Sequence, residues 1–101
     1  MIDVVDTPNP DTKKFVFDKT IVAKGSKEFK KKDGSVSLVD DLFNIGEIEL
    51  IFLDKNFISI RKSKDITWED LTQNVLDSLS KNIKSNFTPL IFEEETEFTD
   101  D

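Results

Sequence analysis

The chain has 101 residues, 37% of them hydrophobic and 35% charged, so it is long enough for one small folded domain and too short for two. It contains no cysteine and no histidine, which excludes disulfides, thiolate or imidazole metal ligands, and nucleophile pairs of the Ser-His or Cys-His type. The formal net charge is −7, of which the acids of residues 93–101 contribute −6, so we predict a near-neutral domain over residues 1–92 and an acidic, disordered tail or linker over residues 93–101.

The first predicted elements are two strands joined by a proline-containing turn. Residues 1–5 are mostly apolar and predict a short strand. The stretch TPNP at residues 7–10 predicts a turn or an extended loop, because each proline fixes φ and removes an N–H donor. An alternating pattern over residues 14–22 predicts the second strand, and we expect its same-face aromatic residues Phe15 and Phe17 to lie in the core.

A loop and a helix are predicted next. Residues 23–35 are rich in lysine, glycine and serine and show no sustained period, so we expect a long loop. The apolar residues that follow recur at helical spacing; they are Leu38, Val39, Leu42, Phe43 and Ile45. We expect Ser35 or Ser37 to cap the start of this helix and Gly46 to end it.

The second half of the chain gives the strongest patterns. Residues 47–62 predict a β-hairpin, because two alternating apolar runs flank turn-forming residues at 54–56. Residues 65–83 predict a helix capped by Thr67, with Asp70 three residues later. Its apolar stripe is Trp68, Leu71, Val75, Leu79 and Ile83. We expect this stripe, including its tryptophan, to face the core.

The order of these elements indicates the fold class. One more short strand is predicted within residues 85–92, so the chain reads strand, strand, helix, strand, strand, helix, strand. Such an order predicts an α+β fold, in which a small antiparallel or mixed sheet carries two helices packed on one face.

Several short motifs occur in one particular order along the chain. They are TPNP at residues 7–10, KF at 14–15, LVDDLFNI at 38–45, NFISIRK at 56–62 and WEDL at 68–71. In this order they resemble the N-terminal domain of the Nfu-type (NifU-like) iron–sulfur cluster scaffold and carrier proteins. The resemblance spans roughly residues 2–85. It departs from the family pattern locally, since Phe17-Asp18 replaces a Pro-Gly turn and Ser37 replaces a helix-opening proline.

The resemblance also implies what this chain lacks. In the family, a Cys-x-x-Cys pair in a separate C-terminal domain helps to hold the cluster. We therefore expect no cofactor in this chain and no enzymatic activity, but a non-catalytic accessory domain that binds iron–sulfur assembly or recipient proteins as a monomer. An excised N-terminal domain is our preferred interpretation. The alternative is a stand-alone protein-binding adaptor of the same fold with no cluster role.

The candidate partner-binding residues fall into two groups. They are Thr7, Pro8, Asn9, Pro10 and Lys14 in the first, and Lys30, Lys31 and Lys32 in the second. A rigid loop loses little entropy on binding, and a basic cluster suits an acidic partner. The alternatives are that residues 7–10 only fix the angle at which the strand begins, and that the lysines form a solvated loop. Nucleic acid is disfavoured, because residues 1–92 are not net basic.

The remaining informative features of the sequence are two acidic pairs and the first residues of the chain. Asp40-Asp41 and Glu69-Asp70 lie near predicted helix starts, where acids favour the helix dipole, so we do not expect acid–base catalysis there. The first residues show no signal or transit peptide, and no apolar run is long enough to cross a membrane. We expect no membrane association, and a location in the bacterial cytoplasm, or in the mitochondrial matrix for a processed eukaryotic chain.

Overall fold

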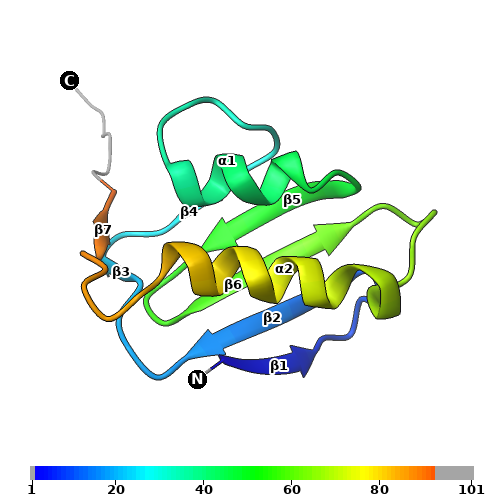
Figure 1. Cartoon of the computed structure of the whole chain (residues 1–101), viewed down its shortest axis with the longest axis horizontal. Helices are drawn as coiled ribbons and strands as arrows, with labels where there is room; N and C mark the ends of the chain where they lie inside the picture. The colour runs from blue at the N-terminus through cyan, green and yellow to red at the C-terminus, as the bar shows by residue number, and fades with distance from the viewer. Residues whose placement is uncertain (1, 93–101) are drawn as a thin grey trace.

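The computed structural model describes residues 2–92, and the predicted acidic tail at residues 93–101 lies outside the described range. The elements, in chain order, are β1 (Ile2–Asp6), β2 (Thr12–Phe17), β3 (Val22–Lys24), β4 (Lys27–Phe29), α1 (Ser37–Asn44), β5 (Ile48–Leu53), β6 (Phe57–Lys62), α2 (Trp68–Asn82) and β7 (Leu90–Ile91). An antiparallel five-stranded sheet has the order β1-β2-β6-β5-β4. Strands β3 and β7 form a separate two-stranded parallel sheet (Figure 1).

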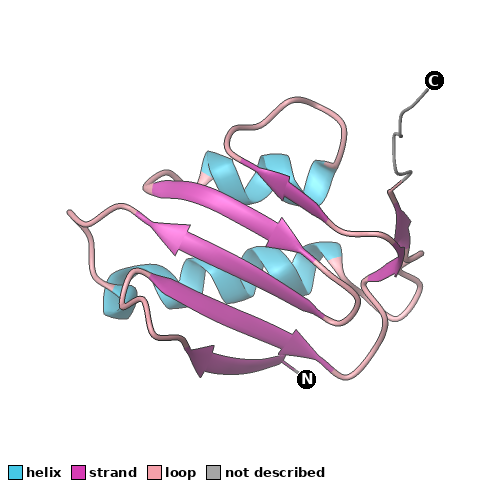
Figure 2. Cartoon of the chain, turned by 180° about the vertical axis from the view of Figure 1, so that it is seen from behind, coloured by secondary structure: helices cyan, strands magenta, loops and turns pink. Residues whose placement is uncertain are grey.

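The molecule has two layers, with both helices on one face of the larger sheet. Viewed from behind, the strands lie in front of the helices and no described element covers them (Figure 2). This arrangement confirms the predicted α+β fold. No helix within residues 2–92 is long and apolar enough to cross a membrane.

Alternating strand residues and the two helical stripes form the core between the layers. The strands contribute Phe15, Phe17, Ile51, Leu53, Ile58 and Ile60, and the helices contribute Leu38, Val39, Leu42, Leu71, Val75 and Leu79. Burial of each such side chain stabilises the fold by about 1.5–3 kcal/mol. The expectation that Phe15 and Phe17 are core residues is confirmed.

The ends of the helices show which capping predictions hold. Thr67 is the N-cap of α2, and its side chain accepts a hydrogen bond from the Asp70 N–H, as predicted. The prediction for α1 is wrong: its N-cap is Val36, no side chain caps it, and Ser37 is already helical. Gly46 follows the C-cap Ile45 with φ of +90°, a conformation that glycine adopts easily, so the predicted stop is confirmed.

Two predicted boundaries in the first half of the chain are wrong. Strand β2 ends at Phe17 rather than continuing, because the chain then turns across the β5–β6 hairpin, where Ile21 N–H donates to the Lys55 carbonyl at 2.6 Å. The predicted loop at residues 23–35 contains the edge strand β4. Only Phe29 of that strand is buried, and three residues are too few to show a period.

Candidate protein-interaction surfaces

The loop between β1 and β2 contains the TPNP stretch and is closed by its own hydrogen bonds. Thr7 Oγ1 accepts from the Asn9 N–H at 3.2 Å and lies 2.9 Å from the Thr12 carbonyl. Asn9 Oδ1 accepts from the Asp11 N–H at 2.9 Å, and the Asn9 carbonyl accepts from the Thr12 N–H at 3.0 Å. The loop therefore has one well-defined conformation, while Pro8, Asn9 and Pro10 remain exposed.

Two long-range contacts fasten this loop to the rest of the fold. The Trp68 indole N–H donates to the Pro10 carbonyl at 3.2 Å, and its ring centroid lies 6.0 Å from that of Phe15. Lys62 is buried, and its ammonium group lies 2.9 Å from Asp11 Oδ1. The loop is thus tied to α2 and β6, which favours a role in fixing the start of β2. Whether it also binds a partner stays a prediction.

The helix-free side of the large sheet, which we call the open face, carries an apolar patch with two cations. Strand pairing places side chains of three strands together there: Lys14 and Val16 of β2, Leu50 and Phe52 of β5, and Phe57 and Arg61 of β6. All six are partly exposed. The Lys14 ammonium lies 4.3 Å from the Phe57 ring centroid, and Arg61 Nε lies 3.6 Å from Glu49 Oε1.

The second group of candidate residues, Lys30, Lys31 and Lys32, follows β4 at the opposite edge of the sheet. We define the lysine cluster as Lys24, Lys27, Lys30, Lys31 and Lys32, all of them exposed. Lys32 donates to Asn44 Oδ1 at 2.7 Å, and the Lys27 ammonium lies 5.1 Å from the Phe29 ring centroid. These contacts leave positive charge at the surface beside β4.

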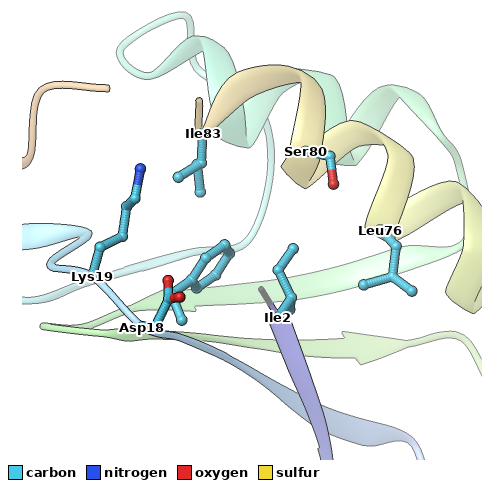
Figure 3. Close-up of a pocket in the computed structure, with 7 residues that line it drawn as sticks. Ile2, Asp18, Lys19, Leu76, Ser80 and Ile83 are labelled. Carbon is cyan, nitrogen blue, oxygen red and sulfur yellow. The ribbon is translucent and has the colours of Figure 1, made fainter. Parts of the chain in front are cut away.

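A pocket of about 360 Å³ opens between the β1–β2 edge and α2. It is lined by Ile2, Phe17, Asp18, Lys19, Leu76, Ser80 and Ile83 (Figure 3). The Lys19 ammonium donates to the Lys84 carbonyl at 2.9 Å. The walls combine apolar side chains with the carboxylate of Asp18. The pocket therefore does not hold a pair of carboxylates of the kind used in acid–base catalysis. Sequence reasoning missed this pocket, because its residues come from three distant segments.

The acidic pairs noted in the sequence make structural hydrogen bonds. Asp40 Oδ1 accepts from the Gly34 N–H at 3.3 Å, and Asp41 Oδ2 accepts from the Asn82 amide at 3.1 Å. Asp70 Oδ2 accepts from the Thr67 hydroxyl at 3.2 Å. Within residues 2–92, no group of three or more Asp, Glu, His or Cys residues is arranged to hold a metal ion.

With this geometry in place, comparison with known proteins gives the family. A sequence profile described as "Scaffold protein Nfu/NifU N terminal" matches residues 2–86. The chain belongs to this family. The resemblance seen in its motifs is thereby confirmed.

Two curated relatives are similar to this Nfu N-terminal domain. The "NifU-like protein C1709.19c" of Schizosaccharomyces pombe is 31% identical over 93 residues, covering 88% of this chain and 35% of the relative. The "NifU-like protein 5, mitochondrial" of Arabidopsis thaliana is 29% identical over 76 residues, covering 73% of this chain and 28% of the relative. The domain thus spans about a third of the length of these relatives.

Solved structures share the fold. The crystal structure of protein SAV1430 from Staphylococcus aureus matches with a TM-score of 0.70 and 25% identity, covering 78% of this chain and 98% of that one. The solution structure of a NifU-like protein from Saccharomyces cerevisiae matches with a TM-score of 0.69 and 23% identity, covering 81% of this chain and 76% of that one. Both comparisons support the two-layer α+β architecture.

In this Nfu N-terminal domain the predicted site residues separate into two places. Residues 7–10 and Lys14 lie at the β1–β2 edge, whereas residues 30–32 follow β4 at the other edge, with β6 and β5 between them. The fold therefore does not bring the eight candidates into one site. Sequence reasoning also missed the Lys62–Asp11 pair, because its members lie 51 positions apart.

Proposed function

We propose that the chain is a non-catalytic, protein-binding domain of an iron–sulfur cluster assembly and delivery protein. The observation that carries the proposal is the family match over residues 2–86 in a sequence without cysteine or histidine. Protein-bound clusters are held mainly by cysteine thiolates. The cluster would accordingly be carried by a part of the protein outside these 101 residues.

The open face is the surface best suited to a protein partner. It offers partly exposed Leu50, Phe52 and Phe57 together with the cations Lys14 and Arg61, next to the exposed TPNP loop. A partner with apolar side chains and a carboxylate placed against Lys14 would complement it, since Arg61 already lies beside Glu49. Its partners in this proposal are iron–sulfur assembly or recipient proteins, bound by one copy of the chain in the bacterial cytoplasm or the mitochondrial matrix.

Reconstitution tests the passive role directly. The chain, incubated with ferrous iron and sulfide under reducing conditions and then desalted, is expected to show no charge-transfer absorbance in the visible range. A stable, stoichiometric cluster on these residues would overturn the proposal. Reading the coding sequence beyond Asp101 tests the remaining part, because a following Cys-x-x-Cys segment supports it.

Nitrogen-15 NMR titration tests the docking surface. The probe is the remaining part of the S. pombe NifU-like protein, which this chain does not cover. We expect amide shifts around Lys14 and Phe57, and Lys14→Glu should weaken binding about 10-fold by placing like charges together. Lys81→Glu is the matched control, because Lys81 is exposed on α2 in the other layer. Equal effects of the two variants would reject the open face.

A stand-alone adaptor of the same fold is the second candidate function. One observation favours it: the solved SAV1430 chain is covered over 98% of its length, so this fold occurs in a chain with little else. A stop codon directly after Asp101 and normal cluster delivery in cells that lack the protein would support the adaptor over the cluster-related role.

A further inference from the structure

The two edges of the five-stranded sheet differ in how well they are protected against pairing with another chain. Strand β4, at one edge, has three residues, begins with Lys27 and is followed by Lys30, Lys31 and Lys32. Short length and lysine side chains are features that keep an edge strand from pairing. Strand β1, at the other edge, has five residues, Ile2–Asp6, and contains neither lysine nor proline. Figure 2 shows β1 at the lower edge of the sheet, with no described strand beyond it.

The backbone of β1 is free to bond on its outer side. A strand directs the N–H and C=O groups of alternate residues to its two sides. Strand β1 pairs only with β2. Among the described residues, no turn or loop donates to or accepts from the backbone of residues 2–6. The outward groups can therefore bond to an added strand, which is how many sheets bind extended peptides.

The side chains of β1 expose apolar surface on both faces of the sheet. Val4 lies opposite the core residue Phe15 and hence on the helix side, where it is 39% exposed. Val5 lies opposite Lys14 on the open face and is 43% exposed. An added strand would cover both valines with its own side chains, so apolar burial would add to the backbone hydrogen bonds.

The pocket between β1, β2 and α2 opens at the same edge. Ile2 lies opposite Phe17 on the helix side, and both residues line the pocket together with Leu76 and Ile83 (Figure 3). On an added strand, the residue opposite Ile2 would place its Cβ about 5 Å away on the same face, beside the pocket. The pocket volume of about 360 Å³ is larger than one aliphatic side chain requires.

The charge of β1 indicates which segment fits. Asp6 is paired with Lys13, whereas no described residue makes a hydrogen bond or ion pair with the Asp3 carboxylate. Lys14, diagonal to Asp3 on the open face, has its ammonium 4.3 Å from the Phe57 ring centroid on β6. A cation opposite Asp3 would therefore complement this edge. A second copy of the chain would instead bring two more aspartates to it, which disfavours self-pairing.

We propose that the edge of β1 binds an extended segment of a partner protein as a sixth strand of the large sheet. The segment carries a lysine or arginine opposite Asp3 and an aliphatic side chain opposite Ile2, beside the pocket. Backbone hydrogen bonds hold the segment, while the carboxylate and the pocket select its sequence. This edge is separate from the open face, and so short a contact suits a transient complex.

Titration of the nitrogen-15-labelled full chain with the peptide acetyl-STVVKIS-amide tests strand addition. In antiparallel register its lysine lies opposite Asp3 and its isoleucine opposite Ile2. We expect saturable amide shifts in residues 2–6, slower amide exchange at alternate residues of β1, and no shift in β4. The peptide with both valines replaced by proline should not bind, because one of two consecutive N–H groups must face β1. Absence of saturable shifts in β1, or equal binding of the proline peptide, would overturn the proposal.

A charge exchange tests the assigned partner chemistry. Asp3→Lys should weaken binding of the lysine peptide at least about threefold, and should strengthen binding of the same peptide with glutamate in place of lysine by a similar factor. Glu28→Lys is the matched control, because Glu28 is the acid of the other edge strand, and it should leave both affinities unchanged. An unchanged peptide preference in Asp3→Lys would overturn the assignment.

The concentration of the chain alone tests the competing occupant. Without peptide, the amide resonances of residues 2–6 should not move between ~0.1 mM and ~1 mM protein, because like charges oppose self-pairing. Movement of these resonances, with a doubled mass in sedimentation, would show a second copy at this edge and overturn the proposal. None of these experiments alters the open face, so their failure leaves the proposed docking function standing.

Discussion

Lys62 shows how one buried charge organises the β1–β2 loop. The residue is 6% exposed, which lysine tolerates only when its ammonium group has partners. Asp11 Oδ1 accepts at 2.9 Å and the Ser63 carbonyl at 3.2 Å, while the Lys62 backbone N–H donates to the Asp11 carbonyl at 2.8 Å. The pair therefore fixes the last residue of the loop directly against the end of β6.

Replacing Asp11 should destabilise the fold more than replacing Lys62. Asp11→Ala leaves the buried ammonium without its carboxylate and should lower the free energy of unfolding by about 1–3 kcal/mol. Lys62→Met removes the charge and keeps the apolar stem, so its effect should stay below about 1.5 kcal/mol. Urea denaturation measures both values. A larger loss for Lys62→Met than for Asp11→Ala would contradict this account of the pair.

Asp33 makes the stability of its turn depend on pH. Hydrogen bonds from the Ser35 hydroxyl, then from its backbone N–H, lower the pKa of this exposed carboxyl below its ordinary value of 3.8. A depressed folded-state pKa means that the turn is stabilised above pH 3.8 and loses that stabilisation as the pH falls through the folded value. Ser35→Ala should raise the pKa of Asp33 in a carboxyl NMR titration, whereas Ser37→Ala should leave it unchanged.

The two helices differ in how they begin, although the sequence offers a hydroxyl residue at both places. At α2 the extended conformation of Thr67 aims its hydroxyl at the Asp70 N–H. At α1 the N-cap position is occupied by Val36, and the Asp40 N–H bonds only to the Val36 carbonyl at 3.0 Å. A capping residue is therefore decided by backbone position, which sequence alone leaves uncertain by a residue or two.

Matched alanine substitutions test this difference between the helices. Thr67→Ala should destabilise the fold by about 1 kcal/mol, since the Asp70 N–H loses its side-chain acceptor. Ser37→Ala should change stability by less than about 0.5 kcal/mol, because its side chain caps nothing. Chemical denaturation of both variants gives the comparison. A Ser37→Ala loss as large as that of Thr67→Ala would show that Ser37 acts as a cap in solution.

The elements that sequence predicted well are those long enough to display a period. The β5–β6 hairpin and α2 extend over six or more residues each, and their alternation or stripe is visible. Strands β3 and β4 have three residues each and are held by pairing with distant chain segments, so no local signal marks them. The same reason hides the candidate surfaces: motifs located Lys14 and the TPNP loop, but the open face emerges only when β2, β5 and β6 pair.

At the scale of the whole molecule, the small β3–β7 sheet pairs the end of the described chain with β3, outside the large sheet. The Leu90 N–H donates to the Ile21 carbonyl at 2.9 Å, and Ile21 is fully buried. Phe92 packs beside Phe29 at the edge of the large sheet. This sheet thereby closes the core at the end opposite the TPNP loop (Figure 1).

Gly25 packs closely against Phe92, the residue that follows β7. It has φ of +78°, and a Cβ placed there would lie 2.6 Å from the Phe92 carbonyl oxygen. Gly34 has a similar φ of +81°, but a Cβ there would meet nothing within 4 Å. The two glycines thus share the backbone cost of an added Cβ and differ only in the collision with Phe92, the residue after β7.

Alanine at each glycine separates these two effects. Gly34→Ala should lower the free energy of unfolding by about 1 kcal/mol, from positive φ alone. Gly25→Ala should lower it by about 2–4 kcal/mol, because the backbone around Phe92 must also move. Urea denaturation measures the losses, and faster amide exchange at Leu90 and Phe92 in Gly25→Ala alone would locate the damage. Equal losses in the two variants would show that the contact between Gly25 and Phe92 does not hold β7 in place.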